Sequence, residues 1–149
     1  MPHAPLELER FLPYRLSILS NTVSQAIARE YAQRFELGVT EWRVIAVLAR
    51  YDGEGLSARE VALRTAMDKV AVSRALARLV AAGRVRRRMH RGDRRRSVLA
   101  LTARGWRIHD AVAPRARAHE TALLARLDAD ERVHLERILD KLLAAAATG

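Results

Sequence analysis

The 149-residue sequence contains no cysteine, which excludes disulfide bonds, thiolate metal ligands and thiol-based redox sensing. Its longest apolar run near the end, LLAAAA at 142–147, is far too short to span a membrane. The N-terminus, MPHAPLELERF, lacks the apolar core of a signal peptide. We therefore expect a soluble, cytoplasmic protein. The length suffices for one domain with a core and is short for two independent ones.

Motifs that carry catalysis are also missing. No GxSxG, P-loop or HExxH motif occurs, so we expect no enzyme activity and no cofactor. Five histidines are present, but no two have the i, i+4 spacing of a zinc pair, and His109 and His119 fall on different faces of a predicted helix. We expect exposed histidines rather than a metal site.

Positive charge dominates what is present. The formal net charge is +10, and Lys69 and Lys141 are the only lysines among 27 basic residues. Guanidinium groups bind phosphates and guanine edges in a two-pronged manner, so the arginine excess favours a nucleic-acid partner. A genome-wide preference for arginine is the alternative explanation of the composition. Half of the residues are hydrophobic, which argues against a disordered chain.

Hydrophobic spacing predicts a mostly helical chain. Apolar residues at steps of three and four predict one long helix after Pro13, which Gly38 ends. A later helix runs to about Leu127 with Pro114 inside it, where a kink is expected. The residues predicted to cap the N-termini of the other helices are Thr40, Ser57, Asp68, Thr102 and Asp128.

Two consecutive helices in the middle of the chain, separated by the link TAMD at 65–68, are typical of a helix-turn-helix. The second helix is predicted to bury Val72, Ala75, Leu76 and Leu79. Its outer side carries the residues that we expect to contact base edges or phosphates in a major groove: Lys69, Val70, Ala71, Ser73, Arg74 and Arg78. A solvated face that contacts nothing is the alternative.

Residues 84–90 and 97–101 alternate in hydropathy around the turn signal Gly92-Asp93, which predicts a hairpin. The apolar residues that would tie its strands to a core are Val85, Met89, Val98, Leu99 and Leu101. A rigid tip beside a recognition helix can reach the neighbouring minor groove. The residues expected at this contact are Arg87, Arg91, Asp93, Arg94, Arg95 and Arg96. We expect Asp93 to pair with a nearby arginine, Arg95 first, and to aim it. A plain solvated charge run is the alternative.

The segment from 61 to 105 strongly resembles the MarR family of winged helix-turn-helix regulators. The family's Asp-x-Arg followed by Leu-Thr-x-x-Gly occurs here as Asp93, Arg95, Leu101, Thr102 and Gly105. The run at 72–87 resembles its recognition helix and first wing strand, and ELGVTEWRVIAVL is similar to the segment that opens its DNA-binding lobe. Val70 and Ala71 stand where hydroxyl residues are common in relatives, so the base preference of this chain is not inferred from the family.

The resemblance implies a mainly α (α+β) fold, with a winged helix-turn-helix lobe at 37–102 and dimerisation helices at 1–36 and 103–149. A two-fold dimer would read a pseudo-palindromic operator with half-sites about 34–36 Å apart. A monomer that buries its own helices is the alternative. In this family small molecules, often aromatic acids, bind between the two lobes, and the candidate lining here is Leu16, Ser20, Trp42 and Arg43. A core role for Trp42 is the simpler interpretation. The absence of cysteine removes the peroxide-sensing branch of the family.

The sequence thus predicts a sequence-specific DNA-binding transcriptional regulator that acts as a homodimer and is released by a small, aromatic-acid-like ligand. Repression is favoured because a dimer across a promoter obstructs polymerase, although the same footprint also permits activation. The rival is a sequence-indifferent nucleic-acid binder, either an architectural DNA protein or an RNA-binding protein. RNA readers usually present aromatic stacking platforms, and the predicted wing has none.

Overall fold

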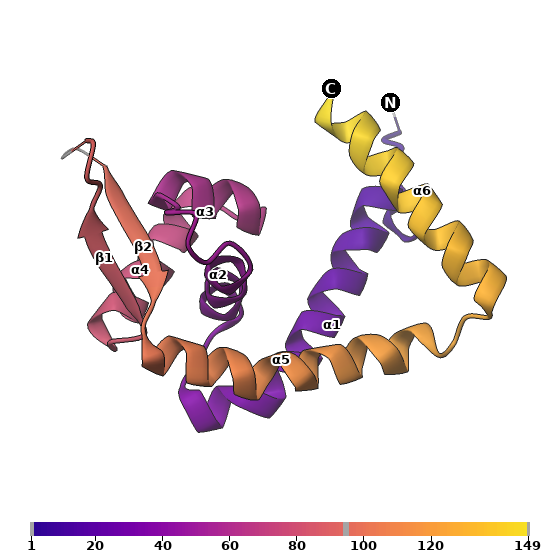
Figure 1. Ribbon diagram of the computed structural model, residues 1–149. Helices are drawn as coiled ribbons and strands as arrows, with labels where there is room; N and C mark the ends of the chain where they lie inside the picture. Colours follow the sequence, from indigo (N-terminus) through magenta and orange to yellow (C-terminus); the bar gives the residue numbers. More distant parts are fainter. Residues whose placement is uncertain (1, 94–95, 149) are drawn as a thin grey trace. The chain divides into compact units, whose positions relative to one another are not determined.

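The computed structural model describes residues 2–93 and 96–148, and over this range the fold is mainly helical with a two-stranded antiparallel sheet (Figure 1). This confirms the predicted fold class. The elements are a short 3-10 helix at Leu8–Arg10, α1 (Leu12–Phe35), α2 (Val39–Arg50), α3 (Ala58–Thr65), α4 (Lys69–Ala81), β1 (Val85–Met89), β2 (Ser97–Leu101), α5 (Ala103–Leu124) and α6 (Ala129–Ala147). The chain forms two compact units that divide between residues 115 and 116. No helix within the described range is long and apolar enough to cross a membrane.

Side-chain caps begin most of the helices where the sequence predicts them. The hydroxyl of Ser57 accepts a hydrogen bond from the Glu60 amide at 3.3 Å, and the carboxylate of Asp68 accepts one from the Ala71 amide at 3.1 Å. Both bonds satisfy amides that the first turn of a helix leaves unpaired. The predicted caps at Thr102 and Asp128 are confirmed in the same way.

Two predicted boundaries near the start of α2 are wrong. The α1 helix ends at Phe35, and Glu36, not Gly38, takes the left-handed conformation that ends it, with φ of 50°. The next residue, Leu37, is buried, so the chain must turn before it reaches the core. Gly38 has extended backbone and is itself the N-cap of α2, which leaves Thr40 inside the first turn.

The C-terminal end of α5 also differs from the prediction. The helix ends at Leu124 rather than Leu127, because a tight turn follows and Asp128 begins α6 with a complete capping box. Pro114 lies inside α5, as the sequence predicts.

The core of the first unit joins the helix-turn-helix to the hairpin. All four α4 residues predicted to be buried are buried, and the strands contribute Val85, Leu99 and Leu101 to the same cluster. Helix α4 contacts β1, while β2 contacts α2 and α3. Because its inner side chains share the core of α4, the hairpin stands beside the helix-turn-helix as a fixed part of the same unit (Figure 1).

Helix α5 begins directly against the base of the hairpin. The Thr102 hydroxyl donates to the Gly83 carbonyl at 2.6 Å, and the Thr102 amide donates to the Arg84 carbonyl at 3.1 Å. A Cβ atom at Gly105 would lie 2.2 Å from that same Arg84 carbonyl oxygen, with Leu101 also close. Only glycine fits at this position without a backbone shift.

Candidate nucleic-acid interface

The outer face of α4 carries the polar residues that the sequence predicts there. Lys69, Ser73 and Arg74 are exposed, and Val70 is exposed beside them, while Ala71 is half-buried. Neither Lys69 nor Arg74 forms a hydrogen bond or ion pair with the residues that the structure describes. Their charged groups are therefore available to a ligand with negative charge, such as a phosphate.

Arg78, the last residue of the predicted α4 set, has a partner within the protein. Its Nε donates to Oε1 of Glu41 at 3.1 Å, and the Glu41 side chain is only 11% exposed while that of Arg78 is 58% exposed. A buried carboxylate is costly without such a partner. Part of the Arg78 guanidinium thus neutralises Glu41, which ties α4 to α2.

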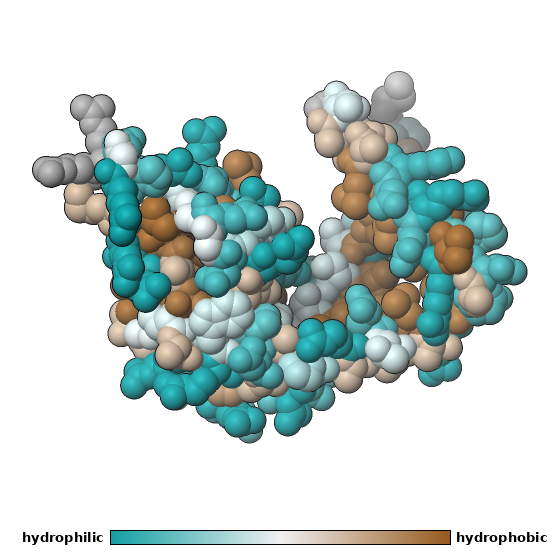
Figure 2. All heavy atoms as spheres, viewed as in Figure 1, coloured by the Kyte–Doolittle hydropathy of each residue, from teal (hydrophilic) through white to brown (hydrophobic). Residues whose placement is uncertain are grey.

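The hairpin has the expected strands, with Val85 opposite Leu101 and Met89 opposite Ser97. Its exposed cations include three consecutive arginines, Arg86, Arg87 and Arg88, and hydrophilic side chains line this hairpin in Figure 2. The prediction that Met89 ties the strand to the core is wrong, because Met89 is 61% exposed. The strand reaches beyond the core before it arrives at Met89.

Short hydrogen-bonded turns close the tip of the hairpin. The His90 amide donates to the Arg96 carbonyl at 2.8 Å, and the Arg96 amide donates to the Asp93 carbonyl at 3.1 Å. The Gly92 amide donates to Nδ1 of His90 at 3.0 Å. Arg91 is exposed on this tip. The predicted contacts of Arg94 and Arg95, and with them the Asp93–Arg95 pair, lie outside the described residues.

Contacts with α3 hold the second strand in place. The Leu99 amide donates to the Leu56 carbonyl at 2.9 Å, just before α3 begins. Nearer the tip, the Arg96 guanidinium forms an ion pair with the carboxylate of Glu60 in α3. Sequence reasoning did not find this pair, and it assigned Arg96 to the DNA contact instead.

Nine arginines between α4 and the start of α5 fall into two groups. In one group the guanidinium bonds the protein itself, either a carboxylate or a backbone carbonyl: Arg78, Arg84, Arg96 and Arg104. In the other group the side chain is exposed and makes no such bond to the described part of the chain: Arg74, Arg86, Arg87, Arg88 and Arg91. The first group fixes the geometry in which the second is presented.

The candidate ligand residues lie around an aromatic cluster. Trp42 packs against the core, with its ring 6.1 Å from that of Tyr31 and 6.0 Å from that of His109. Arg43 donates to the Ser24 hydroxyl at 3.1 Å and approaches that of Ser20 at 3.5 Å. The other candidate, Leu16, is exposed on α1.

The expectation of exposed histidines is wrong for His90, His109 and His119, which are half-buried, whereas His3 and His134 are exposed. Among these, His109 stacks on Trp42 and meets the edge of Trp106 at 5.4 Å. The imidazole ring of His109 packs beside the core, and the low hydropathy of histidine does not predict this burial.

Tyr31 combines deep burial with an unbonded hydroxyl. The residue is 2% exposed, and its OH has no hydrogen-bond partner within the described residues. Burial raises the pKa of this hydroxyl to about 12, with nearby Arg43 opposing the rise and Glu41 adding to it. Tyr31 is therefore a neutral phenol at physiological pH, with a donor and an acceptor left unused.

We expect Tyr31→Phe to leave the free energy of unfolding unchanged or to raise it by about 1 kcal/mol, because it removes a buried polar group that makes no bond. Denaturant unfolding followed by circular dichroism measures this change. A clear loss of stability would show that the hydroxyl is bonded in solution.

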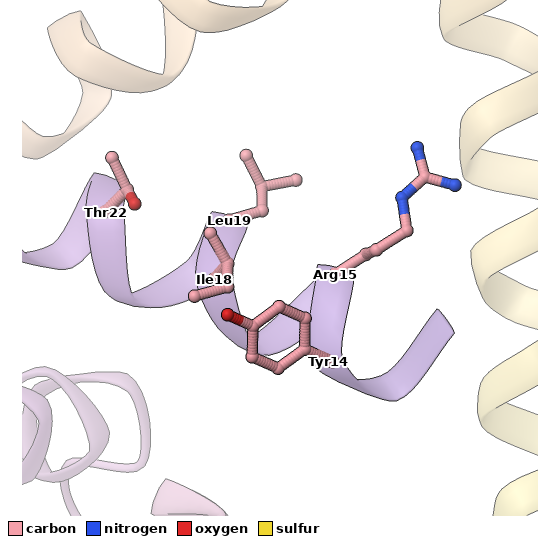
Figure 3. A pocket seen from close by; sticks show the side chains of 5 residues that line it. All are labelled: Tyr14, Arg15, Ile18, Leu19 and Thr22. Atoms are coloured by element: carbon pink, nitrogen blue, oxygen red, sulfur yellow. The ribbon is translucent and has the colours of Figure 1, made fainter. Parts of the chain in front are cut away.

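Exposed apolar side chains gather on α1 and, in the other unit, on α6. A hollow of about 310 Å³ on α1 is lined by Tyr14, Arg15, Ile18, Leu19 and Thr22, whose side chains project from one helix (Figure 3). On α6 the large exposed apolar residues are Val133, Leu135, Ile138, Leu139, Leu142 and Leu143. So much apolar surface on single helices is typical of an interaction face.

Comparisons with known proteins bear out the resemblance. Residues 35–96 match the model of the MarR family. A MarR/EmrR family transcriptional regulator from Acinetobacter sp. ADP1 is 26% identical, with a TM-score of 0.84 over 97% of this chain and 100% of that one. The PcaV transcriptional regulator from Streptomyces coelicolor, solved with its natural ligand, is 25% identical, with a TM-score of 0.72 over 97% and 99%. The S. aureus MepR–DNA complex, at 20% identity and a TM-score of 0.81 over 93% and 98%, shows the same fold. No curated protein matches the sequence significantly.

Proposed function

The chain carries the winged helix-turn-helix lobe of the MarR family, and on that premise we propose that it is a sequence-specific transcriptional regulator that binds operator DNA in the cytoplasm as a homodimer. The observation that carries this proposal is the pairing of an exposed cationic α4 face with an arginine-rich hairpin built on the same core. The structure of MepR with DNA supports it, because that protein has the same fold.

In the proposed complex α4 enters a major groove. Lys69, Ser73 and Arg74 contact bases or phosphates, and Val70 and Ala71 meet thymine methyl groups. The hairpin serves as the wing and lies over the adjacent minor groove, where Arg87 and Arg91 are the described candidates and the sequence adds Arg94 and Arg95. We propose repression, since a dimer across a promoter obstructs polymerase.

The homodimer rests on the apolar faces of α1 and α6. Exposure of Leu, Ile and Tyr side chains to water is unfavourable in free energy. A second copy of the same chain buries them, because a two-fold dimer brings the same apolar faces of both copies together. We propose that the helices within 1–36 and 103–149 form this interface. The two recognition helices then address half-sites about one turn of DNA apart.

Ile138→Glu tests the interface. Ile138 is 50% exposed on the apolar side of α6, so a carboxylate there should be expelled from a dimer contact and shift the protein toward monomer at micromolar concentration. Sedimentation velocity measures the shift. Ala144→Glu is the matched control, because position 144 lies half a turn round the helix from Leu135 on the apolar side, and the substitution adds the same charge. Equal dimer content in the wild type and both variants would contradict the interface.

We further propose that a small aromatic acid releases the DNA, and the PcaV regulator, which was solved with its natural ligand, supports by analogy that the effector is a small molecule. The cluster of Tyr31, Trp42 and Arg43 offers an unbonded hydroxyl, an aromatic wall and a cation, the groups such a ligand needs. Ser20 and Leu16 are the neighbouring candidates on α1. A ligand that favours a spacing of the lobes unsuited to DNA shifts the population away from the DNA-bound form.

Selection of duplexes from a random library by the full-length protein tests the DNA-binding function. We expect a pseudo-palindrome whose half-sites are centred about ten base pairs apart. A selection that enriches no sequence would favour the rival, a sequence-indifferent architectural protein, and equal retention of RNA would favour an RNA binder.

A further inference from the structure

Within the described residues, the outer half of the hairpin places no fully buried side chain in the core. Val85, Leu99 and Leu101 are buried at its base, whereas Met89 and the three arginines before it are exposed. Opposite Met89, Ser97 is only half-buried, and so is Val98, which lies outside the core cluster although the sequence predicts that it ties the strand to the core. The described side chains beyond Leu99 therefore bury too little apolar surface to fix the direction in which the end of the hairpin points.

An ion pair connects this outer half to α3. Arg96, whose backbone closes the tip through His90 and Asp93, places its guanidinium on Oε1 of Glu60 in α3. The two residues are 36 positions apart in the sequence. The contact is thus tertiary, and it connects the tip to the first helix of the helix-turn-helix.

Glu60 is itself held in place. Its amide donates to the Ser57 hydroxyl at 3.3 Å, and that hydroxyl lies 3.1 Å from Oε1, the same oxygen that receives Arg96. The carboxylate is therefore oriented by the N-cap of α3 before Arg96 reaches it. The Glu60 carboxylate therefore has a defined position relative to α3.

From this geometry we infer that Glu60 is a positioning residue for DNA recognition, and that Arg96 acts through it rather than as a phosphate contact. The pair sets the angle of the wing relative to α3 and α4, so that both reach one duplex together. This inference rests on the proposed function and deepens it.

The expected size of the effect follows from the exposure of the pair. The side chains are 42% and 33% exposed, and an ion pair of this kind shifts a conformational equilibrium by about 1.7-fold to fivefold. The apparent affinity is proportional to the fraction of protein whose wing has the orientation that binds DNA. A dimer places two wings on the DNA, so the factor for one wing is squared. The loss of the pair should therefore weaken operator binding by about threefold to 25-fold.

The sign of the Glu60→Gln effect separates positioning from simple charge. Removal of a carboxylate near DNA reduces repulsion, so a purely electrostatic role predicts equal or tighter binding. Positioning predicts weaker operator binding with little change on random DNA and an unchanged thermal midpoint. Glu54→Gln, in the loop before α3, removes the same charge from an exposed site and is the control.

The experiment titrates the full-length protein with selected operator and with random duplex by fluorescence anisotropy. Glu60→Gln should bind operator about threefold to 25-fold more weakly than the wild type, and Glu54→Gln should not. The charge-swapped double variant, Glu60→Arg with Arg96→Glu, has the same net charge as the wild type and should bind operator nearly as tightly as the wild type, because the reversed ion pair still connects the wing to α3.

Unchanged or tighter operator binding by Glu60→Gln, with a wild type that discriminates operator from random DNA, would overturn this inference and leave the proposed function standing. A wild type with equal affinity for both duplexes would overturn the two together. If Glu60→Arg fails to fold, the comparison of Glu60→Gln with Glu54→Gln still decides the matter.

Discussion

Replacement of Arg74 by alanine is expected to weaken operator binding by about 5- to 150-fold, the range for one base contact of 1–3 kcal/mol. Arg74 lies on the exposed face of α4, and its guanidinium bonds no residue that the structure describes. Arg74 therefore differs from Arg78, whose guanidinium neutralises the buried carboxylate of Glu41. The same titration on random duplex should show a smaller loss, because random DNA offers phosphates without the preferred base.

The control for this variant is Arg29→Ala, which removes one exposed arginine from α1, outside the residues proposed to contact DNA. It accounts for the general effect of net charge on DNA binding. Equal losses on operator and random duplex would assign Arg74 to a phosphate rather than a base. If Arg74→Ala and Arg29→Ala bind operator as tightly as the wild type, α4 does not read the DNA.

Gly105→Ala is expected to lower the free energy of unfolding by about 2–4 kcal/mol. The new methyl group would meet the Arg84 carbonyl oxygen at 2.2 Å, and a backbone atom cannot move aside as a side chain can. Alanine also favours helix by about 1 kcal/mol over glycine, but this gain is smaller than the cost of the clash. The base of the wing and the start of α5 must separate, so DNA affinity should fall as well.

Denaturant unfolding of the purified variant measures the loss. Gly92→Ala is the comparison, because a methyl group there meets only His90 at an ordinary 3.5 Å. A Gly105→Ala protein as stable as the Gly92→Ala protein would mean that α5 and the hairpin base are not in close contact in solution.

Local signals in the sequence were sufficient for much of the fold. Ser57, Asp68 and Asp128 cap the predicted helices because capping depends on residues three positions apart. The hairpin was also predictable, because alternating hydropathy on both sides of Gly92-Asp93 is a signal between residues close in the sequence. The predicted end of α1 was wrong because Leu37 is buried, which is a tertiary effect and places the turn at Glu36. Glu36 adopts the left-handed conformation there, although this conformation is unfavourable for a residue other than glycine.

The sequence did not predict which arginines bond to the protein itself and which are exposed without such a bond. In sequence, Arg78, Arg91 and Arg96 are equivalent positive charges, and all three were assigned to DNA. The carboxylates that engage Arg78 and Arg96 lie 37 and 36 residues away, and no local pattern links such distant positions. Only the packing of α2 and α3 against the rest of the lobe reveals which arginines serve the fold.

The central claim is that α4 and a wing fixed to the same core read one duplex as a single unit. A competition titration of the wild-type protein at fixed salt, with selected operator against random duplex, tests this claim most directly. We predict an affinity ratio of about 10³ or more, as for specific DNA-binding proteins. A ratio near one would contradict it, because charge alone binds every duplex equally well.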